Sequence, residues 1–292
     1  MYKLIAIDLD GTMLDTYGEI SQKTKRVLNK AMQKGAKVII ASGRTIDSIK
    51  TIAEEISSDK YIIAGNGSII YDIKQNNVIY EKYIPKSKAL NLIQICEDNN
   101  ISYSVYTNKT IIADSLKYNI LYYYKQNLKK EASKKTSITI VPKIYDYIKN
   151  MENEKVMKIF ICDKHQSVFN SIMRKFSEFD DIEVLDVSHM SRKVIQNGSE
   201  EVSIEYFYTE ITEKNVDKWY ALEYLIDKLH IDKKDIIAIG DNANDIKMIK
   251  QAELGIAMKG SSPKVKKIAN YVTEYDNNHD GAARAIEKFL DI

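Results

Sequence analysis

The sequence predicts an α/β fold in which a doubly wound, Rossmann-like parallel sheet forms the core and a smaller α+β domain is inserted into it. Short apolar runs alternate with amphipathic segments up to about Tyr83, the alternation is lost between Pro85 and about Glu210, and it then resumes. Regular alternation indicates parallel βαβ units, whereas paired strands indicate an α+β arrangement. We therefore expect a core of residues 1–83 and 212–292 and an inserted domain of residues 84–211.

The first part of the core is expected to alternate strands and helices and then to form a hairpin. Ser21 is suited to begin a helix that carries Val27 and Ala31. Gly35 is suited to end that helix, and a second helix is expected over Asp47–Ile56. Nearly continuous apolar runs are typical of parallel strands that are covered on both faces. The expected strands are Leu4–Asp8, Lys37–Ala41 and Tyr61–Ala64, followed by the hairpin of Ile69–Ile73 and Val78–Tyr80.

The inserted domain and the second part of the core complete the expected order. In the inserted domain, helices are expected over residues 88–98, 115–130, 143–150 and 165–177, and strands over 101–106, 110–113, 137–141, 156–162, 182–188 and 201–209. The core then continues with helix Val216–Leu229, strand Ile236–Ile239, a helix from Ala243, strand Leu254–Met258 and helix Ala282–Leu290. The alternation that defines the core is thus expected to resume after the insertion.

The composition is close to that of an average soluble globular protein. The 292 residues leave room for about two domains, and 44% of them are apolar and 29% charged. A formal net charge of +2 gives no reason to expect nucleic acid or an anionic membrane as a partner. Cys96 and Cys162 lie far apart and in no metal-binding spacing, which favours reduced thiols. With no signal peptide and no apolar run of ~20 residues, the expected location is cytoplasmic, without membrane contact.

Polar residues follow several of the expected strands at the point where each strand ends. In an open parallel sheet, ligands bind at the carboxyl ends of the strands. If these strands are neighbours, at least three carboxylates, a hydroxyl and several backbone amides converge in one crevice. The strand-end runs are Asp8-Leu9-Asp10-Gly11-Thr12, Ser42-Gly43-Arg44, Asn66-Gly67-Ser68 and Gly240-Asp241-Asn242-Ala243-Asn244-Asp245.

These residue types suit phosphate chemistry with a hard cation. Crowded carboxylates without nearby histidine or cysteine favour Mg²⁺, which commonly binds through one or two carboxylates and a substrate phosphate. The Ser42 hydroxyl, the Gly43 amide and a lysine could hold the other phosphate oxygens. An aspartate such as Asp8 is ionised at neutral pH and can act as a nucleophile. A second one two residues away, Asp10, can handle the proton of the leaving group.

Each of these residues also has a purely structural interpretation. Asp8 and Asp10 could belong to a calcium-binding loop. Such a loop requires glycine at its sixth position, whereas Gly11 would stand at the fourth. Asp241 and Asp245 could simply favour the start of a helix. The pair Asn66-Gly67 is a common turn, and a lone lysine such as Lys218 is usually a surface residue.

The ordered motifs resemble the haloacid dehalogenase superfamily, specifically the Cof-type phosphatases of subfamily IIB, which carry a large α/β cap after the third core strand. The first, second and fourth motifs of that family match Asp8–Thr12, Ala41–Arg44 and Gly240–Asp245. The third, normally Lys-Gly-x-Ala-Leu, is similar to Lys218-Trp219-Tyr220-Ala221-Leu222, with Trp219 in place of glycine. Gly255-Ile256-Ala257-Met258 and Asn277-x-x-Asp280-Gly281 resemble the tail signature. Lys259-Gly260-Ser261 stands where Gly-Asn-Ala is usual.

The resemblance implies a role for each matched residue. Asp8 would be the nucleophile and a metal ligand, and Asp10 would be the acid–base residue, with its backbone carbonyl also touching the metal. The phosphoryl group would be held by Ser42 and Lys218, with the Gly43 amide beside them. The remaining matched residues would be Asp241 and Asp245 at the Mg²⁺ ion, Asn244 beside them or at the phosphate, and Arg44 and Asn66 facing the cleft between core and cap.

The expected function is therefore that of an Mg²⁺-dependent phosphatase that hydrolyses phosphate monoesters of small metabolites through a phospho-aspartyl intermediate. Sugar phosphates are the leading substrate class, the cap is expected to select among them, and a monomer or weak homodimer is expected. One alternative is a sugar phosphomutase or phosphotransferase on the same fold, which the motifs do not exclude. Another is a non-catalytic regulatory binding protein, which the intact Asp8, Asp10, Lys218 and Asp241 argue against.

Overall fold

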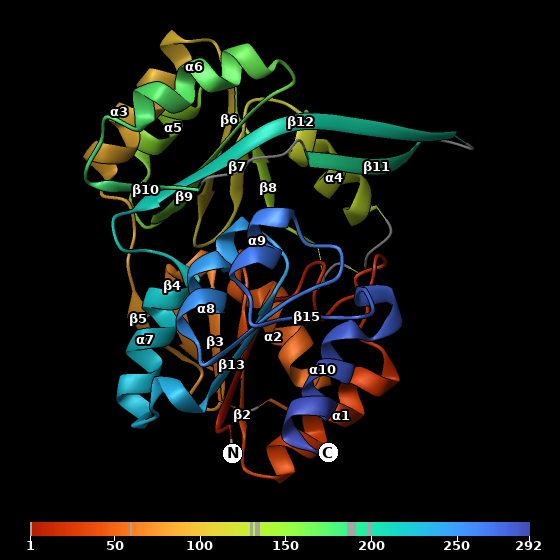
Figure 1. Ribbon diagram of the computed structural model, residues 1–292. Helices are drawn as coiled ribbons and strands as arrows, with labels where there is room; N and C mark the ends of the chain where they lie inside the picture. Colours follow the sequence, from red (N-terminus) through yellow and green to blue (C-terminus); the bar gives the residue numbers. More distant parts are fainter. Residues whose placement is uncertain (1, 59, 129–130, 132–134, 186–190, 198–199) are drawn as a thin grey trace. The chain divides into compact units, whose positions relative to one another are not determined.

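The structure, a computed structural model, describes residues 2–58, 60–128, 131, 135–185, 191–197 and 200–292 (Figure 1). The chain divides into two compact units. The first, here called the core unit, consists of Met1–Glu81 and Val216–Ile292, and the second, the inserted unit, is Lys82–Asn215. The predicted α/β class, with an α+β domain inserted into a doubly wound core, is confirmed.

The core unit contains an eight-stranded sheet in the order β15-β14-β13-β1-β2-β3-β4-β5. Strand β1 is completely buried and pairs in parallel with β13 on one side and β2 on the other. The chain order therefore runs outward from β1 in both directions, and such a switch point leaves a crevice at the carboxyl ends of the strands. The strands are β1 (Leu4–Ile7), β2 (Lys37–Ala41), β3 (Tyr61–Ala64), β4 (Ile69–Asp72), β5 (Asn77–Glu81), β13 (Ile236–Gly240), β14 (Leu254–Ala257) and β15 (Tyr271–Val272).

Two helices of the core unit begin at residues whose side chains cap them. The Ser21 hydroxyl oxygen accepts a hydrogen bond from the Thr24 amide at 3.0 Å, as expected for a helix that begins there. Asp217 caps the helix that begins at Lys218 in the same way, and its side chain accepts from the Tyr220 amide at 2.9 Å. The helices are α1 (Gln22–Gln33), α2 (Ile46–Glu55), α7 (Lys218–Leu229), α8 (Ile246–Gln251), α9 (Pro263–Ile268) and α10 (Gly281–Leu290), with 3₁₀ turns η1 (Gly65–Gly67), η3 (Lys233–Asp235), η4 (Ala243–Asp245) and η5 (Asn277–His279).

The inserted unit is built on a second sheet, in the order β10-β12-β9-β6-β7-β8, with β11 paired to β12. Apolar side chains of α3, α5 and α6 form one hydrophobic cluster with side chains of β6, β7, β9 and β12, so these three helices share one face of the sheet. The helices are α3 (Lys86–Asp98), α4 (Tyr118–Asn127), α5 (Ile144–Asn150) and α6 (Gln166–Phe176). The strands are β6 (Ser102–Thr107), β7 (Ile111–Ala113), β8 (Ile138–Ile140), β9 (Val156–Asp163), β10 (Ile182–Val184), β11 (Ser191–Asn197) and β12 (Glu200–Glu213).

The structure differs from the predicted elements mainly at the end of the inserted unit. The expected strand 182–188 ends at Val184 as β10, and residues 186–188 lie outside the described part. Strand β11 was not predicted, because its sequence is mostly polar and carries no long apolar run. It forms a hairpin with β12, which begins one residue before the expected strand and runs four residues beyond it. The short elements α9 and β15 were also missed.

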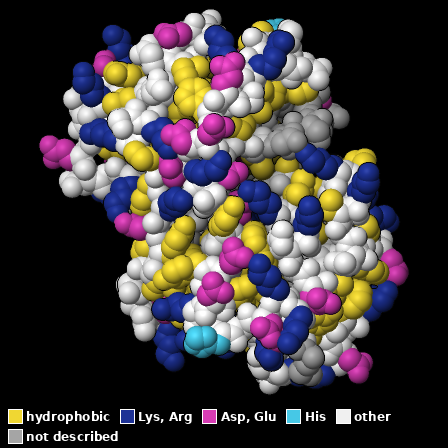
Figure 2. All heavy atoms as spheres, turned by 60° about the vertical axis from the view of Figure 1, so that its left-hand side comes forward, with side chains coloured by type: hydrophobic (Ala, Val, Ile, Leu, Met, Phe, Trp, Pro, Cys, Tyr) yellow, Lys and Arg dark blue, Asp and Glu magenta, His cyan; other side chains and the backbone are white. Residues whose placement is uncertain are grey.

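The surface carries charges of both signs. On the face drawn in Figure 2, Lys and Arg side chains are interspersed with Asp and Glu side chains. This mixture is what a formal net charge of +2 on 43 basic and 41 acidic residues leads one to expect. Within the described ranges, none of the helices combines the length and the apolar character that crossing a membrane requires.

Gly255 in β14 is required by a close approach of the preceding helix. A Cβ atom at this position would lie 1.9 Å from the backbone carbonyl oxygen of Ile249. We expect Gly255→Ala to lower the free energy of unfolding by about 1–3 kcal/mol, because the backbone must shift to make room. Denaturant unfolding measures this, with Gly260→Ala as the control, since a Cβ there meets nothing within 4 Å. A loss for Gly255→Ala no larger than for Gly260→Ala would contradict the close contact.

Candidate active site

The ten predicted site residues all belong to the core unit and to one edge of its sheet. Nine of them follow the carboxyl ends of β1, β2, β3 and β13, which are adjacent and parallel. The tenth, Lys218, is the first residue of α7. The nine are Asp8, Asp10, Ser42, Gly43, Arg44, Asn66, Asp241, Asn244 and Asp245.

The centre of the site is a buried lysine between two carboxylates. The Nζ atom of Lys218 lies 2.5 Å from Asp8 Oδ1 and 2.6 Å from Asp245 Oδ1, and the lysine side chain is fully buried. Burial lowers the pKa of this ammonium group, but the Asp245 and Asp8 carboxylates outweigh it, and the net pKa is raised. Lys218 therefore stays charged, with its donors directed at the end of β1 and at η4.

Asp245 is held so that it orients this lysine. Its second oxygen, Oδ2, accepts hydrogen bonds from the backbone amides of Asp241 at 3.0 Å and Asn242 at 3.1 Å. Both carboxylate oxygens are therefore engaged, and the side chain is completely buried. A carboxylate with this set of partners is suited to position Lys218 more than to bind a metal ion directly.

Three carboxylates face this one ammonium group. Single oxygens of Asp8, Asp241 and Asp245 lie within 4.8 Å of one another. Burial raises the pKa of the Asp8 carboxyl, Lys218 lowers it, and Asp245 and Asp10 raise it, with a net pKa of about 7. Burial also raises the pKa of Asp241 well above its usual range, with Asp8 and Asp245 adding to the shift. When all three carboxyl groups are ionised, the cluster carries more negative charge than its one lysine neutralises.

These groups fit a hard divalent cation. The donors are all carboxylate oxygens, which Mg²⁺ prefers, and a cation beside Asp8 and Asp241 would offset both the burial and the mutual repulsion that raise their pKa values. The approach to Asp241 depends on Gly11, whose φ is +83° and where a Cβ atom would lie 2.5 Å from Asp241 Oδ2. Glycine at this position therefore leaves room for the carboxylate at the loop that follows β1.

Asp10 lies apart from the acidic cluster and pairs with Arg44. Its side chain is 62% exposed, and its two oxygens accept hydrogen bonds from Arg44 Nε at 2.8 Å and Nη2 at 2.5 Å. The Arg44 amide in turn donates to the Ser42 hydroxyl oxygen at 3.2 Å. The pair therefore connects the loop after β1 with the loop after β2. The predicted contact between the Asp10 backbone carbonyl and a metal ion stays a prediction.

Asn66 and Asn244 connect the other strand ends. Asn244 Nδ2 donates to Asn66 Oδ1 at 3.0 Å, and Asn66 takes a left-handed backbone conformation with φ of 57°. The Asn66 amide donates to the Ser42 carbonyl at 3.0 Å, and Gly43 packs closely against the Asn66 side chain. Together with the Lys218 and Arg44 contacts, these bonds join all four strand ends in one connected site.

Thr12 is part of the site and was not among the predicted site residues. Its hydroxyl donates to Asp241 Oδ1 at 3.3 Å and is buried. Its place in the Asp8–Thr12 run was the available signal. Trp219 does not enter the site, because its indole is buried in the hydrophobic cluster of the core, with Lys233 Nζ 5.1 Å from the ring centre.

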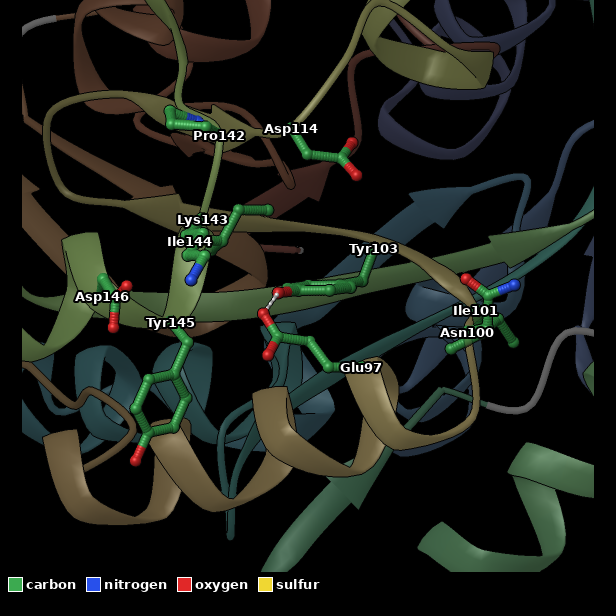
Figure 3. A pocket seen from close by; sticks show the side chains of 10 residues that line it. All are labelled: Glu97, Asn100, Ile101, Tyr103, Asp114, Pro142, Lys143, Ile144, Tyr145 and Asp146. Atoms are coloured by element: carbon green, nitrogen blue, oxygen red, sulfur yellow. Dashed lines mark hydrogen bonds between the residues drawn. The ribbon is translucent and has the colours of Figure 1, made fainter.

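A separate pocket in the inserted unit has the wrong charge for a phosphate. It has a volume of about 370 Å³ and is lined by three carboxylates and one lysine, those of Glu97, Asp114, Asp146 and Lys143 (Figure 3). Glu97 accepts a hydrogen bond from Tyr103 at 2.7 Å. An anionic ligand would be repelled by this lining, and none of the ten predicted site residues belongs to it.

Comparison with known proteins identifies the family of the chain. The profile of the haloacid dehalogenase-like hydrolase family matches residues 5–286. The 5-amino-6-(5-phospho-D-ribitylamino)uracil phosphatase YcsE of Bacillus subtilis is 26% identical over 290 residues, covering 99% of this chain and 96% of that protein. A haloacid dehalogenase-like hydrolase structure from B. subtilis has a TM-score of 0.80 at 22% identity, covering 98% of this chain and 99% of that one.

The fold is also that of the subclass IIB sugar phosphatase BT4131, with a TM-score of 0.76 at 20% identity and coverage of 99% of this chain and 100% of that one. The resemblance found in the sequence motifs is thus confirmed over nearly the whole length of the chain. The chain belongs to the haloacid dehalogenase-like hydrolase family, and within that family it is a Cof-type phosphatase.

Proposed function

We propose that this protein is an Mg²⁺-dependent phosphatase that hydrolyses phosphate monoesters of small metabolites, with sugar phosphates as the leading class. The observation that carries the proposal is the Asp8 carboxylate, which Lys218 Nζ contacts at 2.5 Å within a cluster of three aspartates at the switch point of the sheet. The relative YcsE acts on a phosphorylated ribitylamino compound, which supports a small polyol phosphate as substrate class. The inserted unit would be the cap that selects the substrate.

In the proposed reaction, an Asp8 oxygen attacks the phosphorus atom and the bond from phosphorus to the ester oxygen breaks. Asp10 donates a proton to that ester oxygen, so that the leaving group departs as an alcohol. Asp10 then takes a proton from water, which attacks the phospho-aspartyl group and regenerates Asp8 with release of phosphate. Lys218 stabilises charge on the transferring group, and Ser42 and the Gly43 amide would hold its other oxygens.

Asp8 and Asp241 are the residues that would hold the Mg²⁺ ion, in accordance with the excess of negative charge in their cluster. When bound, the ion would neutralise charge on the phosphate oxygens. Asp245 would act on the same site through Lys218, which it contacts at 2.6 Å. The hydrogen bond between Asn66 and Asn244 would hold together the segments that follow β3 and β13.

The proposed function is tested by phosphate release from a panel of phosphorylated sugars, sugar alcohols and a nitrophenyl phosphate, with Mg²⁺ and with EDTA. We expect Asp8→Asn to abolish turnover, because an amide cannot accept the phosphoryl group. Its circular dichroism spectrum should match that of the wild type. More than a few per cent of wild-type activity in this variant, or full wild-type activity in EDTA, would contradict the mechanism. Isomer formation without net phosphate release would indicate a mutase instead.

Lys218→Ala removes the charge that faces the transferring phosphoryl group. We expect kcat/KM to fall on the order of 10²-fold or more. Removal of this lysine also leaves Asp8 and Asp245 without their common partner, so the melting temperature should fall as well. Lys233→Ala is the matched control, because Lys233 is half exposed in the same unit and pairs with Glu223. Equal kcat/KM values for the two variants would contradict the proposed role of Lys218.

The raised pKa of Asp8 predicts how stability changes with pH without metal. Between its ordinary pKa of 3.8 and about 7, the folded protein keeps a proton that the unfolded chain has released. The contribution of Asp8 to the free energy of unfolding therefore falls as pH rises through this window. We expect Asp8→Asn to become more stable relative to the wild type from pH 4 to pH 7, measured by denaturant unfolding in EDTA.

Mg²⁺ should reverse this trend, because cation binding favours the ionised carboxylates. The rise in melting temperature on adding Mg²⁺ should be larger at pH 8 than at pH 5 and smaller in Asp8→Asn than in the wild type. A rise of equal size in both proteins at pH 8 would place the cation elsewhere.

A further inference from the structure

The turn between β15 and α10, here called the tail turn (residues 273–281), contacts the segment that follows Asp10. It contains η5 and the tail-signature residues Asn277, Asp280 and Gly281, to which the proposed mechanism gives no role. Figure 1 shows α10, which follows this turn, lying beside α1, which follows the loop after β1. The turn and that loop are therefore neighbours within the core unit.

Three side chains of the tail turn bond to one stretch of the loop. Asn277 Nδ2 donates to the carbonyl oxygen of Leu14 at 2.8 Å. Asn278 Oδ1 accepts from the Thr16 amide at 3.0 Å, and Asp280 Oδ1 accepts from the Ser21 hydroxyl. The bond from Asn277 is the one closest in sequence to Asp8 and Asp10.

Leu14 closes the turn that carries Asp10. The backbone amides of Thr12, Met13 and Leu14 all point at the carbonyl oxygen of Leu9, at 3.2, 3.0 and 2.9 Å. A β-bridge also pairs Asp10 with Leu14, and the Leu14 side chain is buried. A side chain that holds the Leu14 carbonyl therefore fixes the closing residue of this turn.

The tail turn is itself anchored, so it can act as a support. The Thr273 hydroxyl is buried, donates to the Tyr275 carbonyl at 2.7 Å and accepts from the Lys259 amide at 2.8 Å. At the other end, the Gly281 amide donates to the Asp276 carbonyl at 2.9 Å, and α10 begins. Asn277 thus projects from a turn that is bonded at both of its ends.

We infer that Asn277 is a positioning residue for Asp10, acting through the Leu14 carbonyl. The inference rests on the proposed function, in which Asp10 donates a proton to the leaving group. Arg44 holds the Asp10 carboxylate from the loop after β2, and the backbone turn from Leu9 to Leu14 sets where the Asp10 side chain begins. A displacement of about 1 Å at a reacting group can cost on the order of 10²-fold in rate.

The chemistry of the leaving group separates this role from a general loss of structure. An alkyl phosphate releases a strongly basic alkoxide unless Asp10 protonates it, whereas a nitrophenyl phosphate releases a phenolate that is stable without a proton. Misplacing Asp10 must therefore slow alkyl ester hydrolysis more than aryl ester hydrolysis. A general loss of folded protein lowers both rates by the same factor.

The test compares kcat/KM for a sugar phosphate and for nitrophenyl phosphate in Asn277→Ala and Asn277→Asp. The second variant keeps the shape of the side chain and removes the donor. We expect about a 10-fold or larger fall for the sugar phosphate and a clearly smaller one for the aryl ester. Asn270→Ala is the matched control. It removes a comparable bond, from the Gly255 amide at 2.7 Å, and should leave the ratio of the two substrates unchanged.

A substrate ratio that stays at the wild-type value in a folded Asn277 variant would overturn the inference while leaving the proposed function intact. Loss of the fold in both variants would overturn it too, because the bond would then serve stability alone. A wild-type protein that hydrolyses neither ester fails at the proposed function instead. The three results are therefore distinguishable.

Discussion

A lysine buried between two aspartates is the interaction on which the rest of the core site depends. Lys218, Asp8 and Asp245 are withdrawn from water, and each would be costly to bury without the others. Asp245 in turn requires the amides of Asp241 and Asn242 in their present places. The positions of the β1 end, the β13 end and the start of α7 are thus set by one group of charges.

The site combines two opposite electrostatic demands. Under the proposed function, a phosphate group needs positive charge, which Lys218 and Arg44 would supply, yet the site also contains a cluster of three aspartates. Under the proposed function, a phosphate ester and a divalent cation therefore enter a site that neither would suit alone. Arg44 is paired with Asp10, so it carries its positive charge beside the proposed acid–base residue without adding to the charge of the acidic cluster.

Much of this architecture could be predicted from the sequence, for a simple physical reason. Strands β1, β2, β3 and β13 are buried on both faces and read as continuous apolar runs, so their ends and the polar residues that follow them were visible. Strand β11 was missed because its mostly polar sequence carries no apolar run, and it is held by its pairing with β12.

The partners of the site residues could not be predicted in the same way. Side-chain directions in three dimensions decide these contacts. They determine which aspartate contacts Lys218, which one pairs with Arg44, and that Asn244 bonds to Asn66. The sequence shows tryptophan at position 219, where the family motif has glycine, but it does not show where the indole lies. Helix geometry turns the indole into the hydrophobic core while Lys218 faces the carboxylates.

The order of the strands also affects how the protein is made. Lys218 follows Asp8 by 210 positions, and the whole inserted unit is translated between them. At a translation rate of about 5–20 residues per second, Lys218 and the neighbouring strand β13 are synthesised roughly 10–40 seconds after β1. The inserted unit is one continuous segment and has all its strands before then. A nascent chain can therefore complete its inserted unit while Asp8, the proposed nucleophile, still lacks every charged partner from the second half of the core.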